Sequence, residues 1–258
     1  MRLKLAWPLI VLALAMLLSC KKDANVKTEP NVPLKMLSRI IELDNDNKVT
    51  FTTFQYDERK RLIGSIKGSE QRTSLSYNGD KLYSSELVFG ATRNQYTVTY
   101  MADKPSLEVL KIYINGTLAK EYTFSPIYTG DKLTEMHSKL DGVVFSIQKF
   151  QYAGDNIVRT ETTQDGRLIK SEMSYDDKKN KFYNAPLLYR LYLDSEERYI
   201  KNNVLKDRRI YDNGTYVDLI NTYTYDTEGF PVTHVRKSVG STGTDHGTYK
   251  YTYEYVNL

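Results

Sequence analysis

The side chains able to do acid–base or metal chemistry are few and scattered along the chain. Three histidines are present, His137, His234 and His246, and no two of them stand at the short spacing that would let one metal ion bind both. A single histidine among strands is most often a solvated or hydrogen-bonded side chain, and a catalytic or metal-binding role is the alternative. We therefore expect all three to be structural.

An acidic segment near the N-terminus has some features of a calcium loop. Residues 44–48 read Asp-Asn-Asp-Asn-Lys. A calcium-binding loop of this type needs Gly at its sixth position and a bidentate Glu at its twelfth. Val49 and Gln55 stand at those positions, so we interpret the segment as a polar hairpin turn. The sequence predicts no metal site and no cofactor.

The sequence shows no clear nucleophile or carboxylate pair. No serine lies in a Gly-x-Ser-x-Gly elbow, and residues 240–243 (Gly-Ser-Thr-Gly) have the composition of a turn. Glycoside hydrolysis needs two carboxylates about 5 to 10 Å apart, which a sequence cannot locate among 32 acidic residues. We predict a protein that is not an enzyme. The alternative is an envelope hydrolase acting on glycans or peptides.

Cys20 is the single cysteine of the chain, and it directly follows a leader sequence. Arg2 and Lys4 precede an almost unbroken apolar run from Leu5 to Leu18. Positively charged residues followed by a short apolar run are typical of a secretory signal peptide, which we place at residues 1–19. One cysteine in an exported protein leaves a thiol that no intramolecular disulfide can use. This thiol therefore calls for another chemical role.

The residues around the cysteine supply that role. Leu17-Leu18-Ser19-Cys20 resembles the lipobox of bacterial lipoproteins, although Leu18 is bulkier than the usual residue at its position. The resemblance implies that Cys20 is acylated and becomes the first residue of the mature protein. Two or three acyl chains hold a protein on a membrane almost permanently. We therefore expect a membrane partnership through a lipid anchor at Cys20.

Residues 20–35 are the predicted lipidated N-terminus and flexible tether. They contain Pro30 and Pro33, no aromatic side chain and no hydrophobic period. Lys21 follows the cysteine, at the position where an acidic residue in lipoproteins is linked to inner-membrane retention. The resemblance thus implies the outer membrane, with the domain facing either the periplasm or the exterior.

The charge balance excludes one class of partner. The chain has 36 Lys and Arg against 32 Asp and Glu, a formal net charge of +4, and its basic residues form no long run. A nucleic-acid binder concentrates basic residues on one face or in one segment. We expect no nucleic-acid partner, while a protein or glycan partner stays open and the oligomeric state is not predicted.

The 22 tyrosines recur at the ends of extended segments. In Tyr225-Asp226-Thr227-Glu228-Gly229-Phe230 a tyrosine ends a strand, Asp and Gly allow a tight reversal, and Phe re-enters the core. Variants of this pattern start at Tyr56, Tyr77, Tyr128, Tyr152 and Tyr211. Asn115-Gly116, Asp141-Gly142 and Asp165-Gly166 fit two-residue reversals, of type I′ for Asn115-Gly116. Asn115 and Asn213 also match glycosylation acceptors, but we interpret them as turn residues.

Between the turns the hydrophobic period is two, as in strands. Tyr249, Tyr251, Tyr253 and Tyr255 share one face of the last segment. We expect these rings to pack on the core or on a neighbouring strand through Tyr223 and Tyr225. The alternative is an exposed row of rings that stacks sugars or grips a peptide. Residues 202–203 (Asn-Asn) are interpreted as a turn that caps its own backbone.

The recurring Tyr-Asp units, followed by Gly or a basic residue and then Leu, resemble the YD (Rhs-type) repeats of bacterial cell-surface proteins. Residues 186–200 break the pattern, since Leu187, Leu188, Leu191 and Tyr192 stand at helical spacing after Pro186. This insert followed by Asn-Asn-Val resembles uncharacterised Gram-negative envelope lipoproteins built from Tyr-Asp-rich strands. That resemblance implies a fold and a location, and no activity.

We therefore predict one all-β domain over residues 36–258. It is expected to be a long curved antiparallel meander, partly barrel-like, with a short helical insert near 186–200 filling the concave side. A propeller is less favoured because the repeats are irregular. The expected function is that of an outer-membrane-anchored, non-catalytic scaffold that binds a ligand or a protein, with ligand-binding residues unknown.

Overall fold

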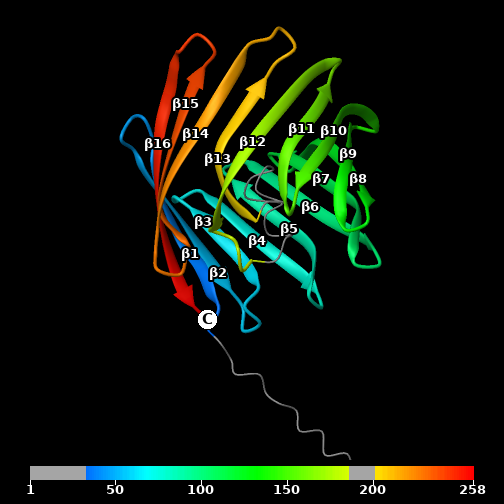
Figure 1. Cartoon of the computed structure of the whole chain (residues 1–258). Coiled ribbons are helices and arrows are strands. Elements are labelled where there is room, and N and C mark those ends of the chain that lie inside the picture. The colour runs from blue at the N-terminus through cyan, green and yellow to red at the C-terminus, as the bar shows by residue number, and fades with distance from the viewer. Residues whose placement is uncertain (1–32, 186–200) are drawn as a thin grey trace, which may run out of the picture. The chain divides into compact units, whose positions relative to one another are not determined.

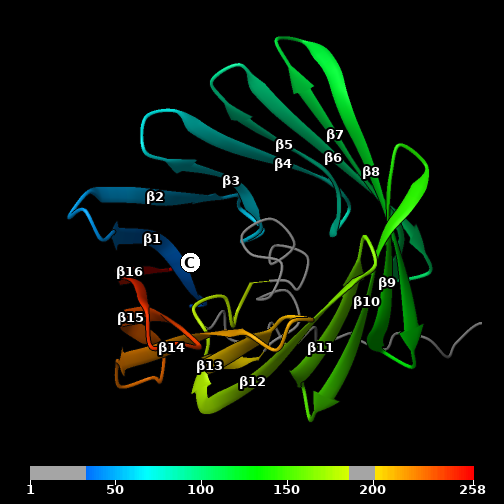
Figure 2. The same ribbon diagram turned by 90° about the horizontal axis from the view of Figure 1, so that it is seen from above.

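The computed structural model describes residues 33–185 and 201–258. Within them the chain forms one closed barrel of antiparallel strands, in which each strand pairs with its sequence neighbours and β1 closes on β16 (Figures 1 and 2). The strands are β1 (Lys35–Leu43), β2 (Val49–Tyr56), β3 (Leu62–Lys67), β4 (Gln71–Asn78), β5 (Lys81–Phe89), β6 (Thr92–Met101), β7 (Lys104–Ile114), β8 (Thr117–Thr129), β9 (Lys132–Leu140), β10 (Val143–Ala153), β11 (Asn156–Gln164), β12 (Arg167–Lys179), β13 (Asn202–Ile210), β14 (Tyr216–Tyr225), β15 (Pro231–Gly240) and β16 (Asp245–Asn257).

The predicted all-β antiparallel fold is confirmed, and the meander closes completely. Leu34 and Leu258 exchange two backbone hydrogen bonds of 2.9 and 3.0 Å beside the β1–β16 pair. We call the end of the barrel that holds these residues and the β2–β3, β4–β5 and later even-to-odd turns the terminal rim. The opposite end, with the β1–β2 and other odd-to-even turns, is the far rim.

The short turns have the backbone that their residues predict. Asn115 and Gly116 both have positive φ, 51° and 79°, as a type I′ reversal between β7 and β8 requires. Asp141-Gly142 and Asp165-Gly166 repeat this geometry at the β9–β10 and β11–β12 turns. These turns match the right-handed twist of the flanking strands, so the hairpins close without splaying.

Six of the recurring tyrosines tie neighbouring strands together near the terminal rim. Tyr77 donates its hydroxyl to the carbonyl oxygen of Leu62 at 2.7 Å, and Leu62 stands just after the preceding turn. The same bond repeats around the barrel in the pairs Tyr56–Leu37, Tyr100–Leu82, Tyr175–Ile157, Tyr223–Val204 and Tyr255–Pro231. Phenylalanine could fill the space but could not make this bond, which explains why tyrosine recurs.

The basic residue after each turn completes the unit. The Arg61 guanidinium lies 4.6 Å from the centre of the Tyr77 ring and also donates to the carbonyl of Gly79 in the next turn. Lys81 lies over Tyr100 in the same way, and donates to a turn carbonyl at 2.6 Å. Further cations over rings are Lys104 over Tyr128 and Lys132 over Tyr152. The tyrosine, the turn and the basic residue therefore form one repeated unit along the terminal rim. We call this unit the interlock: a tyrosine hydroxyl bonds a backbone carbonyl, and a cation lies over the tyrosine ring.

Near the terminal rim, inward apolar side chains of β1 to β5 and β16 pack against the segment that follows β12. Leu37, Phe54, Leu62, Leu75, Leu82, Phe182 and Tyr253 form one buried cluster. Phe182 belongs to the segment after β12, which runs inside the ring of strands in Figure 2, and it meets Phe54 edge to face at 6.1 Å. Asn184 of the same segment donates to the carbonyl of Lys35 at 2.8 Å.

Two predictions concern this region, and only the second falls on described residues. The predicted helix near 186–200 lies outside the described residues, and the described residues contain strands and turns but no helix. Asn202 and Asn203 are the first residues of β13 rather than a turn. The Asn203 amide donates to Asp176 and to the carbonyl of Lys179, so it joins two strands instead of capping its own backbone.

Across residues 33–185 and 201–258, no helix combines the length and apolar character needed to cross a membrane.

Candidate functional site

The lumen above Phe182 contains a chamber of about 250 Å³. The strands supply its wall because alternate residues of each strand point inward. Two rows of inward residues run across β2, β3 and β4: Thr52, Lys67 and Gln71 are register partners in one row, and Phe54, Ser65 and Thr73 in the other. These side chains line one side of the chamber, and residues of β15 and β16 line the other.

The β15–β16 side is a stack of rings. His234 lies between Tyr223, at 4.4 Å between ring centres, and Tyr251, at 4.9 Å, with interplanar angles of 14° and 19°. His234 Nδ1 is 2.9 Å from the Tyr253 hydroxyl, and Nε2 is 2.8 Å from Asn221 Oδ1. Since the Asn221 oxygen can only accept, Nε2 carries the proton and the Tyr253 hydroxyl donates to Nδ1. Packing and hydrogen bonds thus fix the orientation of this wall.

Burial keeps the central histidine neutral. His234 is 2% exposed. Removal from water lowers the pKa of His234 to about 2, and the positive charges of Lys181 and Arg236 add to the effect. His234 therefore contributes a neutral, hydrogen-bonded ring at physiological pH and is not an acid–base catalyst there.

Charged side chains face the chamber on both sides. Lys67 of β3 and Glu42 of β1 form an ion pair of 3.1 Å, and both line the chamber. Arg236 of β15 donates to Asn221 Oδ1 at 3.3 Å. Glu42 is the register partner of Tyr251 across the β1–β16 pair, so a carboxylate and an aromatic ring stand side by side in the wall.

Two acids are buried deeper in the lumen wall. Asp207 is 3% exposed and pairs with Arg209 at 3.0 Å. Burial raises the pKa of Asp207, while the charges of Arg209 and Arg236 work in the opposite direction. Glu108 is fully buried and accepts the hydroxyl of Tyr96. Within the described residues no three His, Cys, Asp or Glu side chains are grouped so that they could hold a metal ion.

The outward wall of the barrel is polar over much of β6 and β16. On β16 the residues that alternate with the inward tyrosines are Thr248, Lys250, Thr252 and Glu254. On β6 the outward positions alternate with the buried residues Tyr96 and Val98, and they are Arg93, Gln95, Thr97 and Thr99. The outward ion pairs include Arg39–Glu254, Arg159–Glu161 and Arg208–Asp218, at 2.6, 2.9 and 2.7 Å.

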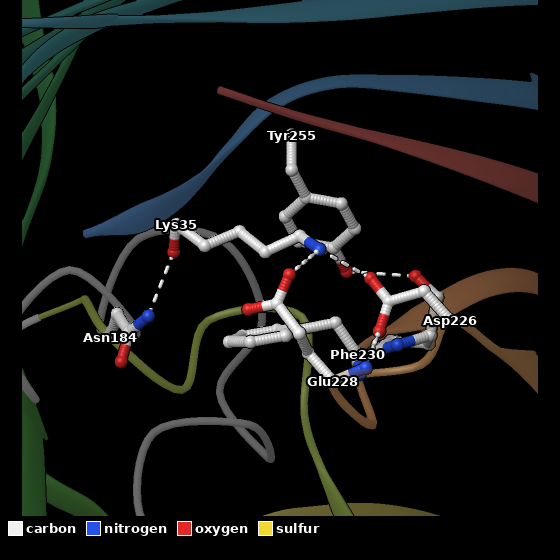
Figure 3. Close-up of polar contacts among 7 residues, drawn as sticks. Lys35, Asn184, Asp226, Glu228, Phe230 and Tyr255 are labelled. Atoms are coloured by element: carbon white, nitrogen blue, oxygen red, sulfur yellow. Dashed lines mark hydrogen bonds and ion pairs between the residues drawn. The ribbon is translucent and has the colours of Figure 1, made fainter. Parts of the chain in front are cut away.

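A second polar cluster closes the barrel at the terminal rim. The ammonium of Lys35 lies between Asp226 and Glu228, at 2.6 and 2.8 Å, and above the rings of Phe230 and Tyr255 (Figure 3). Burial opposes the charge of Lys35, but its hydrogen bonds to the two carboxylates outweigh burial and raise its pKa. The cluster joins β1 to the β14–β15 turn, and we assign it a structural role.

The residues singled out in the sequence have separate places. His234 is a buried wall residue, whereas His137 pairs with Glu135 and His246 is exposed on the far rim. Residues 44–48 form the β1–β2 turn, as predicted. The tyrosines of β16 face inward and pack on core and neighbouring rings, also as predicted.

Sequence reasoning missed Glu42, Lys67, Arg236 and Asn221. The alternation of side chains along a strand could have found them, because each residue stands two positions from an inward side chain of the same strand. Glu42 follows Ile40 in this way, and Arg236 follows His234. A charged residue on the buried face of a strand is unusual and marks a lumen site.

Solved structures with the same fold give the comparison. A porin-like protein from Bacteroides uniformis ATCC 8492 matches with a TM-score of 0.58 and 15% sequence identity, over 85% of this chain and 96% of that protein. A porin-like protein from Bacteroides vulgatus ATCC 8482 matches with a TM-score of 0.60 and 13% identity, over 87% and 100%. No family model and no curated protein sequence matches the chain. The likeness establishes the barrel fold, and the lipobox and YD-repeat resemblances stay predictions.

Proposed function

We propose that this barrel, which shares its fold with the porin-like proteins, stands in water beside the outer membrane and is held there by lipid on Cys20. We further propose that it acts as a non-catalytic scaffold that binds a ligand or a partner protein. The observation that carries the proposal is the set of polar and charged outward side chains on β6, from Arg93 to Thr99, and on β16, from Thr248 to Glu254.

A barrel strand in a bilayer must face lipid with an apolar band about 25 Å tall. Lys250 and Glu254 point outward on one strand, and Arg93 on another. An Arg or Lys on the lipid face costs about 2–4 kcal/mol at the middle of the bilayer. With several such residues and their ion pairs on the outside, this barrel is far better solvated by water.

The lumen also differs from that of a conducting pore. Porins leave an aqueous channel through the barrel. Here the apolar cluster around Phe54 and Phe182 projects into the lumen near the terminal rim, and both rings also line the chamber. This arrangement supports binding within the barrel rather than passage through it.

The location is tested by separating the anchor from the barrel. Cys20→Ser in the full chain removes the acylated thiol, and Cys20→Ala is the matched second variant. We expect wild-type protein in the membrane fraction, and both variants either uncleaved or, where the leader has been removed, folded by circular dichroism and in the soluble fraction. Variants that lack the leader and still stay in the membrane after alkaline carbonate washing would show that the barrel itself is embedded and would refute the proposal.

A hydrolase is the second candidate, favoured by the raised pKa of the buried Asp207. A buried carboxyl whose pKa is raised is a candidate general acid. Turnover of a glycan or peptide that is lost in Asp207→Asn, while Asp218→Asn on the outer wall keeps it, would support this candidate and contradict the scaffold.

A further inference from the structure

We infer that the chamber binds a small polyhydroxylated molecule, of the size of a mono- or disaccharide. This inference rests on the proposed binding function and names its ligand. The chamber holds about 250 Å³, just below the range of about 300–1,000 Å³ in which drug-sized ligands bind. Its occupant is therefore small, and the wall chemistry decides the class.

The wall offers hydrogen bonds to a neutral ligand. Glu42 and Lys67 neutralise each other at 3.1 Å, yet a carboxylate has about four acceptor sites and an ammonium three donors. Both groups therefore keep capacity for further partners. A sugar hydroxyl can donate to Glu42 and accept from Lys67 without adding a charge to the lumen.

The residues on either side of Lys67 add uncharged donors and acceptors. Thr52 of β2 and Gln71 of β4 are its register partners on the two adjacent strands. Ser65 and Thr73 stand in the next row toward the terminal rim. Hydroxyl and amide groups spaced at about 4.8 Å, the distance between strands, suit a ring that carries a hydroxyl on each carbon.

Apolar surfaces complete the match. Tyr251 stands beside Glu42 in the register, and Phe54, Leu87 and Phe182 also line the chamber. Sugar rings present C–H groups on their faces, which pack on aromatic and aliphatic side chains. The Tyr223–His234–Tyr251 stack holds the Tyr251 ring in place before a ligand arrives, which reduces the entropy lost on binding.

The test uses the full chain purified in detergent, with saturation-transfer NMR and calorimetry. The probes are glucose, galactose, mannose, glucuronate and cellobiose, with glycine, alanine and dialanine as the competing class. We expect saturable binding of at least one sugar. Glu42→Gln should weaken that sugar's affinity about tenfold or more, as loss of a hydrogen bond to a charged group does, and Tyr251→Leu should weaken it several-fold.

Matched controls lie on the outer wall. Glu254→Gln and Tyr83→Leu make the same chemical changes outside the lumen, on residues that are outward-facing and, for Tyr83, 57% exposed. Both should leave sugar binding unchanged. Binding of the amino acids or dialanine alone, no sugar binding at all, or equal effects of lumen and outer-wall variants would overturn the inference. Release of Cys20→Ser from the membrane is a separate result, so either proposal can fail alone.

Discussion

The ammonium nitrogen of Lys35 lies 2.6 Å from Oδ2 of Asp226, a residue 191 positions away in the sequence. The contact passes over the last strand, which lies between β1 and β15 in the barrel. It therefore braces the seam at which the first strand, β1, pairs with the last strand, β16.

Removing this contact should destabilise the barrel. Hydrogen bonds to charged, partly buried groups contribute about 1.5–3 kcal/mol, and we expect Lys35→Met to lower the free energy of unfolding by about 1–2 kcal/mol in urea titrations at pH 7. Lys237→Met removes a more exposed pair with Asp245 and should cost under about 0.5 kcal/mol. Equal losses in the two variants would contradict the role of Lys35.

The same contact predicts a pH window. Burial works against ionisation of Asp226, but the hydrogen bonds from Lys35 and from two backbone amides outweigh it and lower its pKa below 3.8. Its contribution is therefore present above about pH 4 and is lost as the pH falls through the folded-state pKa. The raised pKa of Lys35 preserves the contribution up to pH 10.5 and beyond, until the folded-state pKa is passed. The difference between wild type and Lys35→Met should accordingly shrink as the pH falls through the folded-state pKa of Asp226.

His234 should make the barrel sensitive to mild acid. Its folded-state pKa of about 2 lies below the value of 6.5 in the unfolded chain. Stability is complete above pH 6.5 and falls by up to about 1.4 kcal/mol per pH unit below it, because only the unfolded state takes up the proton. Urea titrations at pH 7, 6 and 5 should show this slope in wild type and a flatter one in His234→Gln. His246→Gln, on the far rim, should keep the wild-type slope; a flattened slope there would refute the assignment.

One tyrosine hydroxyl of the interlock can be removed alone. Tyr77→Phe deletes the bond to the carbonyl of Leu62 and should lower the free energy of unfolding by about 1 kcal/mol. Tyr83→Phe makes the same change on an exposed ring and should have an effect below about 0.5 kcal/mol. Thermal unfolding of both variants tests this. A melting temperature for Tyr77→Phe equal to that of wild type would show that the interlock does not depend on the hydroxyl.

Phe182 is the expected anchor of the segment inside the barrel. It is 4% exposed and meets Phe54 edge to face. Phe182→Ala should cost about 3–5 kcal/mol, the range for deletion of a buried phenylalanine. Phe51→Ala, on a ring that is 46% exposed, should cost less than about 1 kcal/mol. Chemical denaturation checks both values, and a small loss in Phe182→Ala would mean that the lumen core does not need this ring.

The local part of the fold could be predicted from the sequence. Strand alternation and turn chemistry are properties of a few adjacent residues, so the inward face of Tyr249–Tyr255 and the Asn115-Gly116 reversal were accessible. Complete closure was not, because the pairing of β1 with β16 depends on the summed twist and stagger of every strand. Asn203 was misread because its partner Asp176 lies 27 positions away, and a local rule favoured a self-capping turn.

The candidate site was harder to predict for a related reason. The alternation of side chains shows that Glu42 and Arg236 face the lumen. It does not show which residues of other strands lie at the same level along the barrel axis. The level of each residue is set by the pairing register of the strands, and β-bulges shift this register, as between Leu37 and Arg39 in β1. The meeting of Glu42, Lys67 and Tyr251 in one chamber is therefore a property of the assembled barrel.

The pairing of β1 with β16 also sets an order of events during biosynthesis. A ribosome makes the first strand about two hundred residues before its final neighbour, and the first fifteen strands can pair before the barrel closes. Until then β1 carries an unsatisfied row of amides and carbonyls, open to pairing with other chains. The incomplete polypeptide is thus most vulnerable to aggregation in the interval before its last thirteen-residue strand is made.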